Sequence, residues 1–247
     1  PPEWGRGGFS YSRVVQPIWN AHCVECHNPI DTPSGLDLTG DKTDFFSVSY
    51  DTLARENQGR EGSPYVNWIP TYNGQEWNIL EVTPKRWGSH KSRLAEVIVT
   101  NHACTKEAKR KFTLTPDERR RIYAWIDLNV PYYGTSETAY PDRIGCRHLY
   151  PADLDAVLAD VGSRRCASCH QPTTPGRHGP EQQQAGIGGL LPAAVPRHVW
   201  TRITRPELNG FLLAPLAKAA GGTEKCGEAV FADKDDQDYR RILETFR

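Results

Sequence analysis

The sequence lacks methionine, net charge and long apolar runs. Its 247 residues hold 30 lysines and arginines against 30 aspartates and glutamates, so we expect no nucleic-acid partner. No run of about 18 apolar residues occurs, and we expect no transmembrane segment. Only 38% of the residues are hydrophobic, while glycine and proline number 21 and 19. Such a chain must build its core from short helices and long connections, or borrow an apolar centre from a cofactor.

Four of the seven cysteines form two C-x-x-C-H motifs, at residues 23–27 and 166–170. This pattern is typical of heme c attachment, in which two thiols bind one porphyrin and the adjoining histidine ligates the iron. A structural zinc site would need four ligands at closer spacing, and a thioredoxin-like site would need a βαβ context. The sequence therefore predicts two covalent heme c groups with iron. Their attachment residues are Cys23, Cys26 and His27 for the first and Cys166, Cys169 and His170 for the second.

The distal ligand of the first iron has to be chosen among the remaining histidines, because the chain contains no methionine. Cytochrome c folds supply the distal ligand from the loop before the last helix, and His102 lies in such a loop. We therefore favour His102 as a metal ligand, with His90 as the fallback. His22 directly precedes Cys23 and is expected at the surface or beside a propionate.

The distal ligand of the second iron has three candidates. His198 stands near Trp200, a plausible packing neighbour for a heme, and we favour it. His178 lies in a loop flanked by glycine, and His148 precedes the next expected helix. These two remain open as alternatives.

The chain is predicted to be mainly α, as two cytochrome c-like heme-binding domains with short helices and long loops. We place the first domain at residues 1–138 and the second at 139–247, because residues 131–138 have the proline, glycine and serine typical of a linker.

Helices are predicted from apolar spacing and from end signals. The clearest begins at Thr115, with Pro116 in the first helical position and Glu118 completing a capping box, and it ends before Pro131. Glycines 221 and 222 are expected to cap another helix. Asp233–Asp238 is interpreted as a charged helix N-terminus rather than a metal site. The other predicted helices cover residues 11–21, 50–55, 89–100, 151–161, 211–220 and 235–246.

Cys104, Cys146 and Cys226 are left over from the motifs. Heme c is attached outside the cytoplasm, so we expect a periplasmic or extracellular protein in which disulfides are allowed. The absence of a signal peptide then suggests a mature or trimmed chain. Cys146 and Cys226 flank the second motif and could form a disulfide, leaving Cys104 free or paired between chains.

Three stretches resemble the middle and C-terminal heme modules of the hydrazine synthase alpha subunit: residues 15–27, 121–134 and 214–222. The resemblance implies two c-type hemes in a mostly helical module, with His102 matching a family histidine before the last helix of the first half. In that family one alpha-subunit heme carries chemistry and has a tyrosine ligand four residues after the proximal histidine. Asp31 stands at the matching position here.

Three functions are compatible with these features. The leading hypothesis is single-electron transfer between other redox proteins by a di-heme cytochrome. A second is self-assembly of copies of the chain, as a homo-oligomer or conducting filament, through a contact that does not close on itself. A third is a heme enzyme for a small nitrogen compound or a peroxide. No proton-transfer or nucleophile constellation stands out, so no catalytic residue is predicted.

Overall fold

The computed structural model describes residues 2–30, 36–55, 65–69, 85, 87–100, 112–134, 149–169 and 201–247. The regular secondary structure of these residues is helical, and they form no β-sheet, with an isolated parallel bridge between Leu216 and Phe231. The mainly α prediction is therefore confirmed. In the part of the chain described, no helix has the length and apolar character that crossing a bilayer requires.

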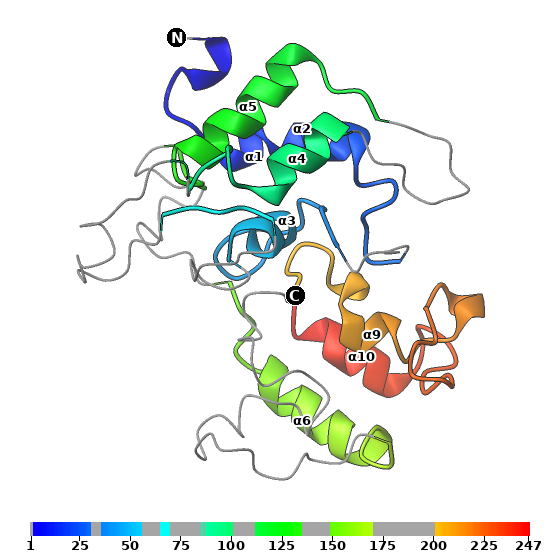
Figure 1. Cartoon of the computed structure of the whole chain (residues 1–247). Coiled ribbons are helices and arrows are strands. Elements are labelled where there is room, and N and C mark those ends of the chain that lie inside the picture. Colours follow the sequence, from blue (N-terminus) through cyan, green and yellow to red (C-terminus); the bar gives the residue numbers. More distant parts are fainter. Residues whose placement is uncertain are drawn as a thin grey trace, which may run out of the picture. The chain divides into compact units, whose positions relative to one another are not determined.

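The chain divides into two compact units (Figure 1). The first contains Pro1–Gly40 and Phe46–Arg147, and the second contains Asp41–Phe45 and His148–Arg247. A five-residue segment from the first half of the sequence is thus built into the second unit.

The first motif is preceded by two short helices, α1 (Tyr11–Val14) and α2 (Gln16–His22). The sequence predicted one continuous helix here. Pro17 has no N–H to donate to the preceding turn, which breaks the hydrogen-bond ladder between α1 and α2. The predicted inward face is nevertheless correct, because Val14, Val15 and Ile18 are all buried.

The helix α5 (Pro116–Asp127) begins with the predicted capping box. Thr115 Oγ1 accepts a hydrogen bond from the Glu118 N–H at 3.2 Å, and Glu118 Oε2 accepts one from the Thr115 N–H at 2.7 Å. The helix ends at Leu128, and Asn129 and Val130 follow with left-handed φ angles of 66° and 52°. That reversal returns the chain to the core before Pro131.

The helix α4 (Arg93–Thr100) contacts α5 (Figure 1). It begins four residues later than predicted, because Ser89 belongs to a turn attached to α5. The Ser89 N–H and Oγ donate to the Asp127 carboxylate at 2.7 and 2.9 Å. The other described helical elements of this unit are η1 (Glu3–Gly5), α3 (Val48–Tyr50) and the π-helical turn η2 (Asp51–Arg55).

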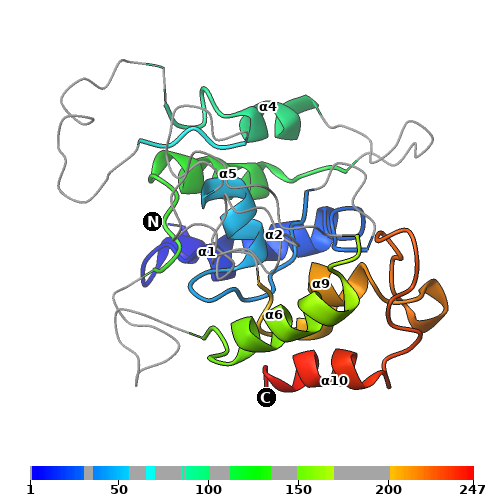
Figure 2. The ribbon, with the colours of Figure 1, turned by 90° about the horizontal axis from the view of Figure 1, so that it is seen from below.

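The second unit is built on α6 (Leu154–Arg165) and α10 (Gln237–Glu244), which lie side by side (Figure 2). Leu158 and Ile242 are among its buried apolar residues. Asp236 is the N-cap of α10 and accepts the N–H groups of Asp238 and Tyr239. The acidic run therefore starts a helix, as predicted.

The prediction of one helix over residues 211–220 is wrong, because the helix in the structure is much shorter. Pro215 cannot donate a backbone hydrogen bond, so α9 (Gly210–Leu213) ends before it. In the remainder of the predicted range the chain forms a 3-10 turn, η6 (Lys218–Ala220), which ends at Gly221 with a φ of 88°. The predicted glycine cap is therefore present on a much shorter element. Another 3-10 turn, η5 (Pro206–Leu208), precedes α9.

Candidate heme-attachment sites

The first motif is a single turn at the end of α2. Cys23 is the C-cap residue, with φ −122° and ψ −37°, and its N–H donates to the Trp19 carbonyl at 2.8 Å. The Cys23 carbonyl then accepts the N–H groups of Cys26 at 3.1 Å and His27 at 2.8 Å. All three motif residues are half-buried. The turn therefore gathers two thiols and one imidazole at a partly open position.

The second motif repeats this local geometry at the end of α6. Cys166 is the C-cap, with φ −121° and ψ −19°, and its N–H donates to the Gly162 carbonyl at 3.0 Å. The Cys169 N–H donates to the Cys166 carbonyl at 3.1 Å, the same distance as in the first motif. Cys166 is half-buried and Cys169 is exposed, and both thiols are free. His170 lies outside the described residues.

The described residues of these two turns are compatible with covalent heme attachment. In the described ranges, no three His, Cys, Asp or Glu side chains converge as a protein-built metal site requires. A c-type heme asks less of each turn: two accessible thiols and an adjacent histidine. The exposure of Cys169 and the half-buried positions of the other described motif residues meet that requirement.

Hydrogen bonds between uncharged groups connect the first motif to the buried side chains of Trp19 and Tyr11. The Trp19 carbonyl accepts the N–H groups of both Cys23 and Val24. The Trp19 indole donates to the Tyr11 hydroxyl at 2.9 Å, and Tyr11 donates to Ser49 Oγ at 3.0 Å. Burial raises the pKa of Tyr11 far above its ordinary value, although the bonds to Ser49 and Trp19 oppose the shift. The network is therefore uncharged.

A contact between a histidine and a carboxylate joins the end of α2 to the start of α5. His22 Nε2 lies 2.9 Å from Glu118 Oε1, so the capping glutamate also contacts the residue preceding Cys23. Burial tends to raise the pKa of Glu118, but hydrogen bonds from the Thr115 backbone and from His22 outweigh it and lower the pKa. His22 was expected at the surface or beside a propionate, and the structure gives it this carboxylate partner.

The second motif is held by ion pairs instead. Asp238, on α10, has a side chain only 10% exposed and lies 2.8 Å from Arg164 and 3.2 Å from Arg165, the last residues of α6. The Arg164 hydrogen bond is the main reason that the pKa of Asp238 is lowered. Arg165 also reaches Asp236 at 3.2 Å and lies 5.5 Å from the centre of the Phe231 ring.

Cys226 is a third thiol in the electrostatic surroundings of the second motif. Burial is the main cause of the raised pKa of Cys166, and the nearby Cys226 raises it further. The pKa of Cys226 is raised by burial and, to a smaller extent, by Cys169. Cys226 is exposed, and Cys146, the partner predicted for it in a disulfide, lies outside the described residues. The Cys226 N–H donates to the Ala214 carbonyl.

The predicted distal ligands are not tested by the described residues. His102 and His198 lie outside them, as do the alternatives His148 and His178. The fallback His90 is exposed on the turn before α4. Cys104 and Cys146 also fall outside the described ranges, and so does Asp31.

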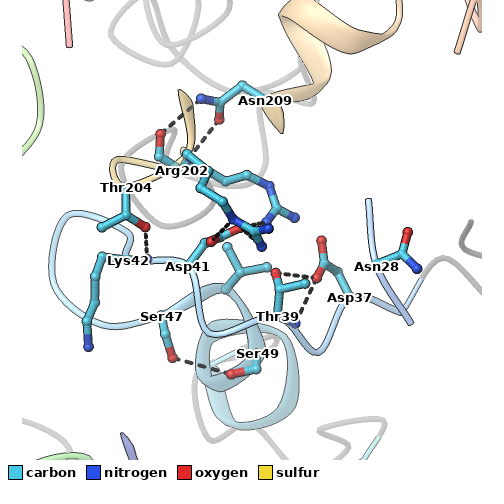
Figure 3. A network of polar contacts seen from close by, with 12 residues as sticks. Asn28, Asp37, Thr39, Asp41, Lys42, Ser47, Ser49, Arg202, Thr204 and Asn209 are labelled. Atoms are coloured by element: carbon cyan, nitrogen blue, oxygen red, sulfur yellow. Dashed lines mark hydrogen bonds and ion pairs between the residues drawn. The ribbon is translucent and has the colours of Figure 1, made fainter. Parts of the chain in front are cut away.

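The five-residue segment of the second unit carries a buried ionic cluster that sequence reasoning missed (Figure 3). The Asp41 carboxylate, with a side chain 7% exposed, binds the Arg202 guanidinium and accepts Arg205 Nη2 at 2.8 Å. Burial, with Arg205 nearby, lowers the pKa of Arg202 to about 10. Beside this cluster, the Lys42 carbonyl accepts the Ile203 N–H at 2.7 Å. Partners this distant in sequence leave no local signal.

Comparison with known proteins finds a distant similarity over part of the chain. The chain is similar to hydrazine synthase subunit alpha of Kuenenia stuttgartiensis, with 30% identity over 132 residues, which is 49% of this chain. The match spans 15% of the length of that protein. No protein-family model and no solved structure matches the chain.

Proposed function

We propose that the protein is a di-heme c-type cytochrome that transfers single electrons outside the cytoplasm. The observation that carries the proposal is the repetition of one backbone geometry at two C-x-x-C motifs. Each first cysteine is the C-cap of a helix, and each second cysteine donates to the first at 3.1 Å. The two turns belong to different units, which supports one heme in each.

In this proposal each residue has a defined role. Cys23 and Cys26 bind the first porphyrin through thioethers, and Cys166 and Cys169 bind the second. His27 and His170 are the proximal iron ligands. A bound heme supplies a reversible one-electron carrier, while the protein fixes its orientation and its access to water. His102 and His198 remain our proposed distal ligands.

The first test is whether the chain carries two covalent hemes. The full chain should be produced with a cytochrome c maturation system, and its heme content measured by intact mass and by the pyridine hemochrome spectrum. Two hemes are expected in the parent chain and one in each double variant, Cys23→Ser/Cys26→Ser and Cys166→Ser/Cys169→Ser. Cys226→Ser is the matched control and should retain both. A parent chain without covalent heme would refute the proposal.

The similarity to hydrazine synthase subunit alpha favours a second candidate, a heme enzyme acting on a small nitrogen compound. Carbon monoxide distinguishes the two functions, because it binds only an iron with an open or labile position. Ferrous protein whose spectrum ignores carbon monoxide has both irons closed by protein ligands, which supports electron transfer. A shifted spectrum would support the enzyme, and His102→Ala and His198→Ala would show which iron each histidine closes.

A further inference from the structure

The second unit brings a third thiol into the neighbourhood of the second motif. Cys166, Cys169 and Cys226 are all free. After burial, which is the larger cause, Cys226 raises the pKa of Cys166, and Cys169 does the same for Cys226. Electrostatic effects of this kind act between neighbouring groups. The three side chains therefore belong to one cluster, although Cys226 comes from a distant part of the sequence.

The contacts of Arg165 place the segment that carries Cys226 beside the motif. Arg165 directly precedes Cys166, and its Nη2 donates to the Val230 carbonyl. Its guanidinium also lies 5.5 Å from the centre of the Phe231 ring. Val230 and Phe231 follow Cys226 by only a few residues. The residue before the first motif cysteine is thus fastened to the segment that contains the third thiol.

Cys226 itself lies on an exposed turn that has room to move. Lys225 and Cys226 are the central residues of this turn, which the Gly227 N–H closes by donating to the Glu224 carbonyl at 3.0 Å. The hydrogen bond from the Cys226 N–H to the Ala214 carbonyl is long, at 3.4 Å. Among the described residues, no heavy atom lies within 4 Å of the position that a Cβ on Gly227 would occupy. The thiol can therefore approach the motif without disturbing the core.

Exposure distinguishes the three thiols from one another. Cys169 and Cys226 are exposed, whereas Cys166 is half-buried. Exchange between thiols and disulfides depends on access to the reacting sulfur atoms, which favours the two exposed cysteines. The first motif has no such neighbour in the described part of the chain, where Cys23 and Cys26 are the cysteines of the first unit.

We propose that Cys169 and Cys226 form a disulfide when the second motif carries no heme, and that heme attachment there consequently depends on a reductant. The second part of this inference rests on the proposed function. The oxidant is a small disulfide such as oxidised glutathione. Two thiols lose two electrons and two protons, one S–S bond forms, and the oxidant leaves as two thiols. Cys169 must be a thiol again before it can form a thioether, so a reductant has to cleave the bond first.

The first experiment maps the disulfides of the heme-free full chain. The chain is equilibrated with glutathione redox buffers, its free thiols are alkylated, and the peptides of the monomer are analysed by mass spectrometry. We expect Cys169 joined to Cys226, with Cys166 alkylated. Cys166→Ser is the matched variant and should retain this bond, because it cannot form a disulfide within the motif. Cys169 joined only to Cys166 in the parent chain, or Cys226 alkylated throughout, would overturn the proposal.

The second experiment measures how heme attachment depends on the same redox buffers. Heme is supplied to the full chain at graded ratios of reduced to oxidised glutathione, and peptide mass spectrometry gives the occupancy of each motif. If the Cys169–Cys226 bond outcompetes the bond within the motif, removing Cys226 must make the second motif easier to reduce. We therefore expect Cys226→Ser to reach half-occupancy of the second motif at a several-fold lower ratio than the parent chain. Occupancy of the first motif should not change.

The same ratio in Cys226→Ser and in the parent chain would overturn the dependence of attachment on this disulfide. Because Cys226 is exposed, Cys226→Ser should fold like the parent chain. A fully reduced parent chain without covalent heme at either motif would instead refute the proposed function, and the peptide map of the heme-free chain would still decide whether the disulfide forms.

Discussion

The two motifs have the same backbone turn but are anchored by opposite chemistry. In the first unit the turn is backed by buried aromatic rings and neutral hydrogen bonds through Trp19 and Tyr11. In the second unit, Arg164 and Arg165 fasten the end of α6 to Asp238 on α10. The short motif therefore fixes its own local shape, while the support behind it depends on the surrounding sequence. The two supports should respond differently to cavities, charge removal, salt and acid.

The largest effect is expected from Trp125→Ala in the first unit. Trp125 is 0% exposed, and its loss leaves a cavity in the aromatic core, costing about 4 kcal/mol. Hydrogen exchange followed by mass spectrometry should show α1, α2 and α5 losing protection while α6 and α10 keep theirs.

Leu158→Ala is the matched change in the second unit, where Leu158 is 3% exposed. It should cost about 3 kcal/mol and shift the loss of protection to α6 and α10. Equal loss of protection in both units from either variant would contradict the separate cores.

A smaller effect is expected from Asp238→Asn. The amide cannot neutralise two guanidiniums, but Arg164 and Arg165 are 47% and 33% exposed, so water compensates in part. We expect a loss of about 1–2 kcal/mol in urea unfolding of the second unit. Asp235→Asn is the control, since Asp235 is 79% exposed and should change almost nothing. If Asp238→Asn lowers the free energy of unfolding no more than Asp235→Asn does, the ion pairs of Asp238 do not stabilise the second unit.

Thr115→Ala tests the junction between α5 and the first motif. It removes the N-cap hydroxyl and should cost about 1 kcal/mol in the first unit. Because Glu118 is then held by fewer partners, the His22–Glu118 contact should also weaken, and the NMR chemical shifts of the His22 ring protons should change. Ser163→Ala, at an exposed helical hydroxyl of α6, is the control and should leave those chemical shifts unchanged.

The smallest effect concerns pH and salt. The folded-state pKa of Asp238 lies below its ordinary value of 3.8, so its stabilisation is complete above that value and is lost as the pH falls through the folded pKa. Acid unfolding of the second unit should therefore begin below about pH 4, and Asp238→Asn should flatten the profile. Added salt should weaken the second unit more than the first, since Asp160, Arg164 and Arg241 form exposed ion pairs. Equal salt sensitivity of both units would contradict the contrast.

Local signals made part of this structure predictable from the sequence. The capping box at Thr115 and the apolar stripe through Ile122 and Trp125 located α5, because both depend on residues within a few positions of one another. The helical context of both motifs could be predicted for the same reason. Pro17 and Pro215 were also visible in the sequence, and giving full weight to their missing N–H groups would have predicted the break before α2 and the early end of α9.

The rest depends on packing between distant positions. Nothing near His22 indicates that its partner is Glu118, and nothing near Asp41 indicates Arg202. The position of Cys226 in the electrostatic surroundings of the second motif is likewise set by the fold of its own loop, where the Cys226 N–H reaches Ala214. The motif spacing predicts the attachment residues, whereas the side chains that support the two motifs are seen only in the three-dimensional structure.

The segment Asp41–Phe45 has a consequence for how this gene can be divided. Asp44 Oδ1 accepts the N–H groups of Leu149 and Tyr150, and Asp41 neutralises Arg202 and Arg205. A gene fragment that begins at residue 139, the domain boundary predicted from the sequence, would encode the second half without either carboxylate. Its product would carry two guanidiniums whose acidic partner had been left on another polypeptide. The second half of the gene can therefore be recombined with other sequences only if these five codons are transferred with it.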